Sequence, residues 1–230
     1  MKLLTVIPAR SGSKGIKNKN LTKFLGKPLI KYSINFAKKI KNNTIIVSTD
    51  SKKIKNLAYQ DLEINDYVRP KNLSRDETPL EDTLHHVVKW AVNKGIFFDL
   101  ILILQPTSPL RKLIDIKEIL KKFKDQKKCH SLCSVIKMRT NPTECVVRNQ
   151  EKWSFIVKGK IGNRQKYKDS YYFIDGSYYL LRKEFFLKNK EIISKKNIFY
   201  PLSVDYPLDI DDNLDLKVAE VIYKNYNGNK

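Results

Sequence analysis

Apolar residues gather in short runs separated by longer stretches with helical periodicity. The runs are apolar or β-branched nearly throughout and lie at 3–7, 44–48, 64–68, 100–104 and 131–136. Because few positions in such a run are polar, each predicts a strand covered on both sides, as in a parallel sheet. The helical stretches lie between them, at 28–40, 51–60, 79–94 and 113–125.

The regular alternation of strand and helix predicts the fold class. Strands that alternate with helices pair in parallel through right-handed crossovers, with helices on both faces of the sheet. We therefore expect an α/β fold, a Rossmann-like, doubly wound and mostly parallel sheet. In such sheets ligands bind outside the carboxyl ends of the strands.

Polar clusters follow the first four predicted strands at the point where each one ends. They are Pro8-Ala9-Arg10-Ser11, Ser48-Thr49-Asp50, Arg69-Pro70 and the segment from Gln105 to Arg111. Loops are commonly polar, so one such cluster says little. The agreement of all of them indicates a ligand site at this edge of the sheet.

The pattern changes after Lys137. Residues 138–176 lack clear helical periodicity and contain short β-like pieces at 145–147 and 153–157. We expect a single domain over 1–230 with a small inserted dimerisation lobe at about 138–176. Regular structure returns at 176–181, and a last helix is expected near 213–225.

Composition excludes several classes of protein. The chain has 230 residues, 41% of them apolar and 10% aromatic, which excludes a disordered protein. No apolar run approaches the ~20 residues of a membrane span, so no membrane partner is expected. The run at 3–7 is too short for a signal peptide and is expected to be the first strand. The three cysteines have no metal-ligand spacing, and we expect a cytoplasmic protein.

The formal net charge of +21 raises the question of nucleic-acid binding. Most lysines, however, are scattered as pairs along presumed helix faces, at 38–39, 52–53, 121–122, 127–128 and 195–196. A lysine-rich solvated surface explains this distribution, and no nucleic-acid partner is expected. A basic nucleic-acid-binding protein is kept only as a remote alternative.

The loop after the first strand predicts a polyphosphate site. Arg10, Lys14 and Lys19 would contact and neutralise a triphosphate, and Asn20 would hydrogen-bond a base or ribose. Three small residues offer backbone donors, namely Ser11, Gly12 and Ser13. The loop lacks the Gly-x-x-x-x-Gly-Lys-Ser/Thr order of a Walker A motif. The alternative is a basic surface loop with no ligand.

The loop that begins at Gln105 is stiffened by two prolines. An amide just after a buried strand suits recognition of a nucleobase. The alternative is a proline-rich turn, and the loop taken alone does not decide between the two.

Asp209 and Asp211 are two residues apart, so their side chains share a face of an extended segment. Two carboxylates can hold Mg²⁺ and leave positions for phosphate oxygens and water. The alternative is that Asp211 or Asp212 caps the following helix. We expect Asp212 to cap it and Asp209 to serve the metal.

Other polar residues carry weaker signals. Arg164 lies in the irregular lobe, and two interpretations stay open: a mobile clamp on an anionic substrate, or a surface arginine without a ligand. His85 and His86 lie in a helical pattern, where a structural role is expected. Neither a Ser/His/Asp nor a Cys/His arrangement stands out, so covalent catalysis has no support.

Taken together, these motifs resemble the acylneuraminate cytidylyltransferases, the CMP-sialic acid synthetases and relatives that act on other nonulosonic acids. The matching segments occur in family order along nearly the whole chain. They are Ile7 to Ile16 with Lys19-Asn20, Val47 to Asp50, Arg69-Pro70, Leu104 to Arg111, Arg164-Gln165, Gly176-Ser177 and Leu208 to Asp211.

The resemblance implies an activity: CTP and an acidic α-keto sugar give a CMP-sugar and pyrophosphate, for surface glycan synthesis. It implies a homodimer whose lobes cross over to the partner. It also implies roles for residues in four groups: Arg10, Lys19 and Asn20 on CTP; Arg69, Thr78 and Gln105 helping to hold the nucleotide; Asp209 and Asp211 on Mg²⁺; Arg164 on phosphates or sugar.

The chain departs from the family in the region of sugar contact. It has Phe173-Ile174-Asp175-Gly176 where sialate enzymes often show Arg-Pro-Asn-Gly or Glu-Asn-Gly, and Leu80 where a serine is frequent. The sugar therefore stays open among N-acetylneuraminic, legionaminic and pseudaminic types. The nearest alternative is another sugar nucleotidyltransferase, such as a CMP-Kdo synthetase-type enzyme.

The expected chemistry is an in-line attack by the anomeric hydroxyl of the sugar on the α-phosphorus of CTP. Such a transfer depends mainly on positioning and on neutralisation of charge. We expect Arg10, Lys19, Arg164 and Asp211 to act in it. No side chain stands out as a general base.

Overall fold

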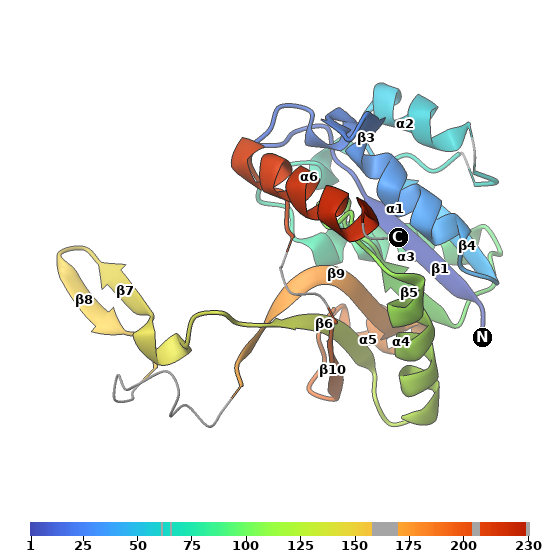
Figure 1. The fold of residues 1–230 in the computed structure, drawn as a ribbon. Coiled ribbons are helices and arrows are strands. Elements are labelled where there is room, and N and C mark those ends of the chain that lie inside the picture. Colours follow the sequence, from blue (N-terminus) through green and yellow to red (C-terminus); the bar gives the residue numbers. More distant parts are fainter. Residues whose placement is uncertain (61, 65, 158–169, 204–207, 229–230) are drawn as a thin grey trace.

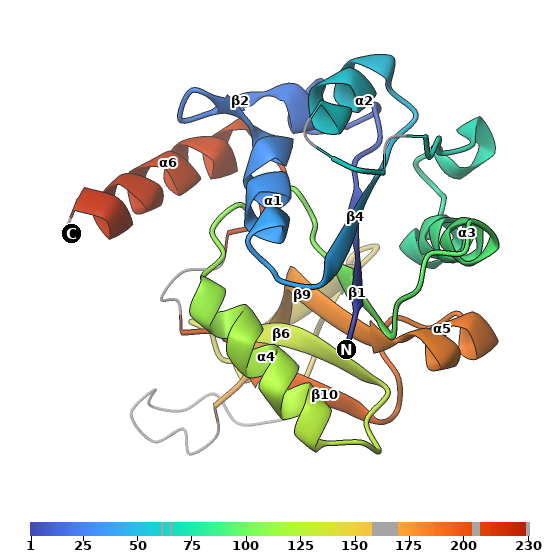
Figure 2. The same ribbon diagram turned by 90° about the vertical axis from the view of Figure 1, so that its right-hand side faces the viewer.

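The computed structural model describes all residues except 61, 65, 158–169, 204–207 and 229–230. Within this part of the chain, six strands form the central sheet in the order β10-β6-β9-β5-β1-β4. Their bounds are Leu3–Pro8 (β1), Asn43–Ser48 (β4), Leu100–Ile103 (β5), Ser131–Lys137 (β6), Tyr172–Arg182 (β9) and Asn197–Pro201 (β10). Helices cover both faces of the sheet (Figures 1 and 2).

Every described helix except Lys183–Asn189 matches a predicted stretch, and two short pairs of strands lie outside the main sheet. The helices are Leu29–Lys38 (α1), Lys52–Tyr59 (α2), Leu80–Asn93 (α3), Leu113–Asp125 (α4), Lys183–Asn189 (α5) and Asn213–Gly228 (α6). The short strands are Lys23–Phe24 (β2), Lys27–Pro28 (β3), Val146–Asn149 (β7) and Lys152–Phe155 (β8). Single 3-10 turns occupy Lys19–Leu21 (η1), Lys71–Leu73 (η2) and Pro142–Glu144 (η3).

The sheet is mostly parallel, which confirms the predicted fold class. β1 pairs in parallel with β4 and β5, and β10 pairs in parallel with β6. The exception is β9, which lies antiparallel between β5 and β6. A long strand that enters between two parallel ones joins the two halves of the sheet into one layer.

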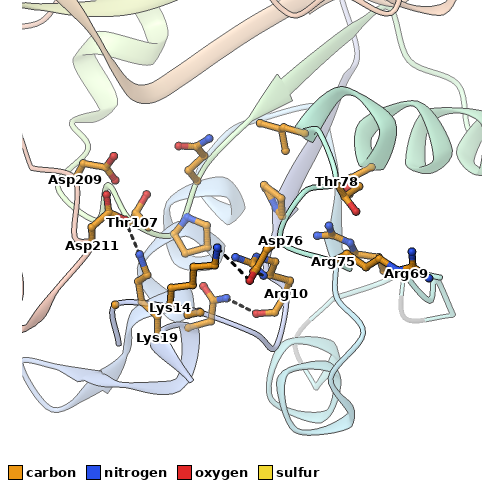
Figure 3. Close-up of a pocket in the computed structure, with 18 of the residues that line it drawn as sticks. Arg10, Lys14, Lys19, Arg69, Arg75, Asp76, Thr78, Thr107, Asp209 and Asp211 are labelled. Carbon is orange, nitrogen blue, oxygen red and sulfur yellow. Dashed lines mark hydrogen bonds and ion pairs between the residues drawn. The ribbon is translucent and has the colours of Figure 1, made fainter. Parts of the chain in front are cut away.

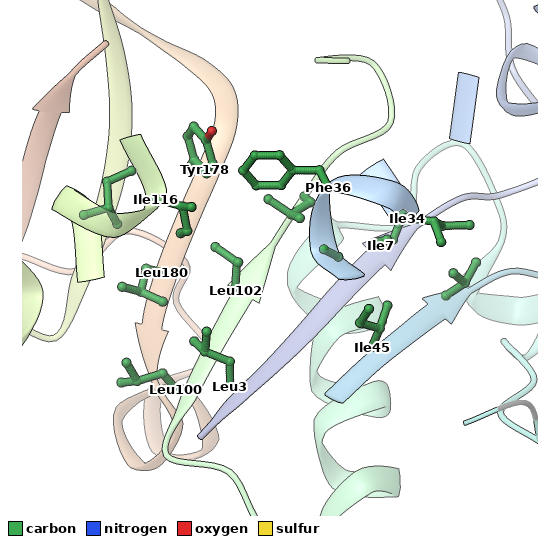
Figure 4. Packing of buried hydrophobic residues seen from close by; sticks show 14 of the residues in the cluster. Leu3, Ile7, Ile34, Phe36, Ile45, Leu100, Leu102, Ile116, Tyr178 and Leu180 are labelled. Carbon is green, nitrogen blue, oxygen red and sulfur yellow. The ribbon is translucent and has the colours of Figure 1, made fainter. Parts of the chain in front are cut away.

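Alternate residues of the buried strands face two separate cores, so a strand without a polar face is what the fold requires. From β1, Leu3 and Ile7 pack under α1, α2 and α4, whereas Leu4 and Val6 pack under α3 and α5. Figure 4 shows part of the first core, where Phe36 of α1 lies next to Tyr178 of β9, and Ile116 of α4 lies on the other side of Tyr178.

The strand predicted at 64–68 is wrong: the described residues of this segment form no strand. Tyr59 explains the difference, because its hydroxyl lies 2.9 Å from the carbonyl of Val47 and 2.8 Å from that of Tyr67. The side chain thus stands between the edge strand β4 and the segment, where ladder hydrogen bonds would lie. Two apolar residues of the run serve the second core instead: Tyr67 is fully buried in it, and Ile64 packs against it.

The region from Met138 onward carries the predicted short β pieces. β7 and β8 pair as an antiparallel hairpin whose eight residues are all exposed, and the hairpin projects away from the sheet (Figure 1). Residues 158–169, which include Arg164, lie outside the described residues. No helix in the described part of the chain has both the length and the apolar character of a membrane span.

Candidate functional site

A cavity of about 570 Å³ opens at the carboxyl ends of β1 and β5, the edge at which the sequence predicts a ligand site. Its lining comes from four segments that are distant in the chain. They contribute Pro8, Arg10, Ser13, Lys14, Gly15, Lys19 and Asn20; Arg69, Arg75, Asp76, Thr78, Leu80 and Thr83; Gln105, Pro106 and Thr107; and Asp209, Asp211 and Asp212. Figure 3 shows Asp209 and Asp211 at one end and Arg69 and Arg75 at the other.

Most of the predicted site residues meet in this cavity, but Ser11 and Gly12 do not line it. Both donors of Ser11 are bound to Asp50: its backbone N–H donates to Oδ1 at 2.8 Å and its hydroxyl donates to Oδ2 at 2.6 Å. Asp50 follows β4, so this contact anchors the front of the loop to the neighbouring strand. Ser11 therefore shapes the loop and has no donor directed at a ligand.

Asn20 also holds the loop in place. The residue is buried, and its Nδ2 donates to the carbonyl of Arg10 at 3.0 Å. This bond fixes the backbone from which the Arg10 side chain enters the cavity. A hydrogen bond made by a buried amide is costly to break, because the amide would be left unsatisfied.

Arg10 and Lys14 share one carboxylate, that of Asp76. Arg10 Nη1 donates to Asp76 Oδ1, and Lys14 Nζ lies 3.5 Å from Oδ2 (Figure 3). The hydrogen bond from Arg10 is the main reason that the pKa of Asp76 is lowered. Asp76 belongs to the segment before α3, so these contacts join two walls of the cavity.

Arg69 is a buried cation in the wall of the cavity. Its guanidinium donates through Nε and Nη2 to the carbonyl of Leu73, the Nε contact being 2.8 Å. Burial lowers its pKa, the effect expected when a charged group loses hydration. The bonds to Leu73 fold the segment after Arg69 into η2 and so place Arg75 to Thr78.

Lys19 connects the front loop to the aspartate segment. Its ammonium donates to Asp211 Oδ1 at 2.7 Å and to the carbonyl of Ile210 at 2.9 Å. The backbone of the same segment is held from the other side, because Ile210 N–H donates to the carbonyl of Thr107 at 2.9 Å. The segment is thus tied to two loops at the carboxyl edge of the sheet.

The two alternatives for the aspartates are separated by their contacts. Asp212 caps α6, because its Oδ1 accepts from the N–H groups of Leu214 and Asp215 at 2.8 and 2.9 Å. Asp211 instead pairs with Lys19, and Asp209 faces the cavity. The capping explanation therefore holds for Asp212 and does not account for Asp209 or Asp211.

The pair Asp209 and Asp211 fits a divalent cation. Asp209 is accessible from the cavity, yet crowding by protein atoms raises the pKa of its carboxyl group, with the charge of Asp211 adding to the shift. A cation would relieve both effects. No group of three or more His, Cys, Asp or Glu residues is arranged for a metal among the described residues, so further ligands would come from substrate and water.

Gln105 is held by hydrogen bonds to its backbone carbonyl, and its side chain lies close to Gly176. The partly buried Arg111 donates from Nη2 to the carbonyl of Gln105 at 2.6 Å and from Nε to that of Ser177 at 2.8 Å. Desolvation lowers the pKa of Arg111 to about 10. On the other side, a Cβ on Gly176 would stand 2.8 Å from Gln105 Oε1.

Sequence reasoning missed several residues of this site. Arg75, Asp76 and Thr83 line the cavity, and Arg111 supports it from behind. The available signal was the charged cluster at 75–77, which stands between a polar strand-end motif and the helix predicted at 79–94. His86 bonds the Tyr67 hydroxyl through Nδ1 at 3.0 Å, a structural contact outside the cavity lining.

A family model described as cytidylyltransferase matches residues 4–227, nearly the whole chain. The chain belongs to this cytidylyltransferase family. The family resemblance drawn from the motifs is thereby confirmed.

Curated relatives agree with this assignment. The chain is 36% identical over 146 residues to a CMP-N,N'-diacetyllegionaminic acid synthase of Legionella pneumophila, over 63% of the chain and 62% of that protein. It is 31% identical over 154 residues to an N-acylneuraminate cytidylyltransferase of Escherichia coli (66% and 35%). It is 35% identical over 124 residues to a pseudaminic acid cytidylyltransferase of Campylobacter jejuni (54% and 53%). The matches thus span less than two thirds of each of these relatives.

Solved structures confirm the fold. A CMP:2-keto-3-deoxy-manno-octonic acid synthetase complexed with CTP superposes with a TM-score of 0.71 at 19% identity, over 98% of this chain and 100% of the other. A 4-diphosphocytidyl-2C-methyl-D-erythritol synthase from Anaerococcus prevotii superposes with a TM-score of 0.64 at 12% identity, over 97% and 96%.

Proposed function

We propose that this chain transfers the cytidylyl group of CTP to a nonulosonic acid and releases pyrophosphate. The observation that carries the proposal is the composition of the cavity. Arg10, Lys14 and Lys19 stand in the same space as Asp209 and Asp211, at the carboxyl edge of the sheet in a member of the cytidylyltransferase family. A polyphosphate needs the cations, and a divalent ion needs the carboxylates.

The reaction follows from this arrangement. The anomeric hydroxyl oxygen of the sugar forms a bond to the α-phosphorus, and the bond from that phosphorus to the oxygen bridging to the β-phosphorus breaks. Its electron pair leaves with pyrophosphate, and the hydroxyl proton is released to solvent in the overall balance. The protein contributes position and charge: Arg10, Lys14 and Lys19 neutralise the phosphate oxygens.

We further propose that Asp209 and Asp211 hold Mg²⁺ together with substrate oxygens and water. When bound there, the ion would neutralise the charge that develops on the transferred phosphate. Lys19 stands at the junction of the two halves of the site, since it already contacts Asp211. Gln105 would hydrogen-bond the nucleotide from its fixed position on the opposite wall. Arg69 and Thr78 would help hold the same nucleotide, and Arg164 would reach its phosphates or the sugar.

The sugar is proposed as a nonulosonic acid because three relatives are named for legionaminic, acylneuraminic and pseudaminic acids. The segment from Phe173 to Gly176 departs from the pattern frequent in sialate enzymes, and Gly176 packs against Gln105 in the cavity wall. We therefore expect the choice among these sugars to depend on this part of β9.

We also propose that the chain acts as a homodimer through the lobe at 138–176. The described hairpin and the residue that follows it expose apolar side chains: Val146 is 46% exposed, Trp153 64%, Phe155 52% and Ile156 62%. Burial of such a patch against a second copy would stabilise the association. Trp153→Asp is expected to give monomers in light scattering, whereas the matched change Phe97→Asp, at an equally exposed position, is not. Dimers that survive Trp153→Asp would count against this interface.

The decisive experiment measures pyrophosphate release from CTP, UTP or GTP with N-acetylneuraminic, legionaminic, pseudaminic and Kdo acids. We expect turnover with CTP and one of the first three sugars. Preference for Kdo or for another nucleotide would replace the proposal by the rival sugar nucleotidyltransferase.

Asp211→Ala tests the metal assignment. The folded variant is expected to lose nearly all turnover, whereas Asp125→Asn, an exposed change on α4, is expected to keep it. Full activity of Asp211→Ala at saturating Mg²⁺ would remove Asp211 from the metal site.

A further inference from the structure

We propose that Asp76 is a built-in counter-ion of Arg10 and Lys14 and competes with phosphate for them. The proposal rests on the proposed function for the identity of the anion, a polyphosphate. It assigns to Asp76 a positioning role that acts through the two cations, and it predicts that Asp76 weakens polyphosphate binding.

The contacts support an exchange. One carboxylate oxygen of Asp76 accepts from Arg10 and the other lies 3.5 Å from Lys14, so both oxygens face cations expected to bind phosphate. A phosphate oxygen is chemically equivalent to these carboxylate oxygens as an acceptor for guanidinium and ammonium groups. The Arg10, Lys14 and Asp76 side chains are 30%, 78% and 36% exposed, so each can exchange partners without unpacking the core.

The net charge of the cavity lining is small, so each carboxylate in it has a large effect on the binding of an anion. Among the described lining residues, five are Lys or Arg and four are Asp, a balance of +1. Asp209 and Asp211 would be matched by a bound cation, and Asp212 caps α6. Asp211 also pairs with Lys19, but among the described lining residues Asp76 is the carboxylate that pairs with proposed phosphate ligands and has neither a proposed metal ion nor a helix cap as a second role.

Two effects of Asp76 oppose each other, and their magnitudes decide the direction. Asp76 holds Arg10 in place, but a partly exposed ion pair contributes little to order. Against this, Asp76 repels every charge of a polyphosphate bound nearby, and this repulsion grows with the charge of the ligand. The net expectation is that Asp76 lowers polyphosphate affinity. In turnover, the same effect speeds the departure of pyrophosphate, which carries its charge away from the same cations.

The test measures binding of tripolyphosphate, pyrophosphate and inorganic phosphate to the full chain by calorimetry in metal-free buffer. Asp76→Asn, which keeps the shape and one acceptor oxygen but removes the charge, is expected to bind tripolyphosphate about fivefold more tightly. The gain is expected to be smaller for pyrophosphate and smallest for phosphate. Asp76→Glu retains the negative charge, so its affinity for tripolyphosphate is expected to stay near that of the original chain.

Asp66→Asn is the matched control, because it removes an ion-paired aspartate (Lys94 Nζ at 2.6 Å) that does not line the cavity. Its affinities are expected to be unchanged. Asp76→Ser gives a second neutral variant, and unfolding curves check that each protein is folded. Unchanged or weaker tripolyphosphate binding in both neutral variants overturns the proposal, as does a gain independent of ligand charge.

Turnover supplies a separate readout. With CTP and the preferred sugar, Asp76→Asn is expected to lower KM for CTP and to lower kcat through slower pyrophosphate release, with stronger inhibition by added pyrophosphate. Because anion binding is measured without any sugar, a chain that bound polyphosphate as expected but transferred no cytidylyl group would refute the proposed function alone.

Discussion

Gly15 lies against the backbone of Asp211, so close that a Cβ on Gly15 would stand 2.0 Å from the carbonyl oxygen of Asp211. The two residues come from opposite ends of the chain. Their contact sets the distance between the cationic loop and the aspartate pair, and Lys19 spans it with bonds to Ile210 and Asp211. Only a residue without a side chain fits at position 15.

Gly15→Ala is therefore expected to push the two segments apart. We expect a loss of about a hundredfold in kcat/KM, because a displacement of roughly 1 Å is enough to misalign a phosphoryl transfer. We also expect a loss of about 1–3 kcal/mol in the free energy of unfolding from overpacking. Pyrophosphate release and urea unfolding measure these. Gly12→Ala is the stability control, since its Cβ would meet only the flexible end of Arg10 at 3.4 Å.

Gly176→Ala tests the support of Gln105. Gly176 has φ +77°, and its Cβ would stand 2.8 Å from Gln105 Oε1. A positive φ costs a non-glycine residue about 1–2 kcal/mol, which thermal unfolding will show. The displaced amide is expected to raise KM for CTP. If stability falls while KM stays unchanged, Gly176 serves the fold of β9 and not the position of Gln105.

Arg111→Met removes the charged donor that binds the carbonyls of Gln105 and Ser177. We expect a loss of about 2–3 kcal/mol in the free energy of unfolding, because hydrogen bonds from a charged donor contribute more than neutral ones. Arg111→Lys keeps the charge but cannot reproduce the forked geometry, so it is expected to recover part of the stability and less of the activity. The exposed change Arg148→Lys, on β7, is expected to alter neither. Equal activity of Arg111→Lys and the original chain would contradict this account.

Asp115 is a buried acid at the start of α4, 4% exposed, and burial raises the pKa of its carboxyl group. The folded state then binds the proton more tightly than the unfolded chain does. The stability contributed by Asp115 is therefore lost as pH rises from the ordinary carboxyl pKa through the raised one, and it is recovered on acidification.

Asp115→Asn is expected to remove this pH-dependent component and to make the protein more stable at neutral pH. Urea unfolding at a series of pH values checks it, with the exposed Asp125→Asn on the same helix as control. A variant whose pH dependence matches that of the original chain would show that Asp115 is not the group responsible.

The sequence predicted the elements well where the pattern is local. The strands β1, β4, β5 and β6 and the long helices lie where hydrophobic periodicity predicts them, because burial on two faces leaves a continuous apolar run. The same rule failed at 64–68, since Tyr67 is buried by packing and not by strand pairing. It also could not show that β9 runs antiparallel, because direction depends on which neighbours the strand meets.

The candidate site was likewise predicted only in part. Loops at the carboxyl ends of strands and the order of the motifs placed Arg10, Lys19, Gln105, Asp209 and Asp211 in one region, and their meeting in one cavity agrees with that prediction. The sequence did not predict which acidic side chain pairs with which basic one, because charge alone does not specify the contacts. Asp76 reaches Arg10 because the segment from Arg69 to Asp76 turns toward the loop after β1. The hydrogen bond from Arg69 to the carbonyl of Leu73 holds this turn.

The sequence by itself determined the alternation of strands and helices, the edge of the sheet at which the cavity opens and the family of the protein. Only the tertiary structure decided that Gly15 meets Asp211, that Asp212 caps α6 while Asp211 binds Lys19, and that Asp76 pairs with Arg10 and Lys14. The physical reason is the separation along the chain of the residues that interact. Periodicity and motifs express forces between near neighbours in the chain, whereas these contacts depend on how separate loops pack at one edge of the sheet.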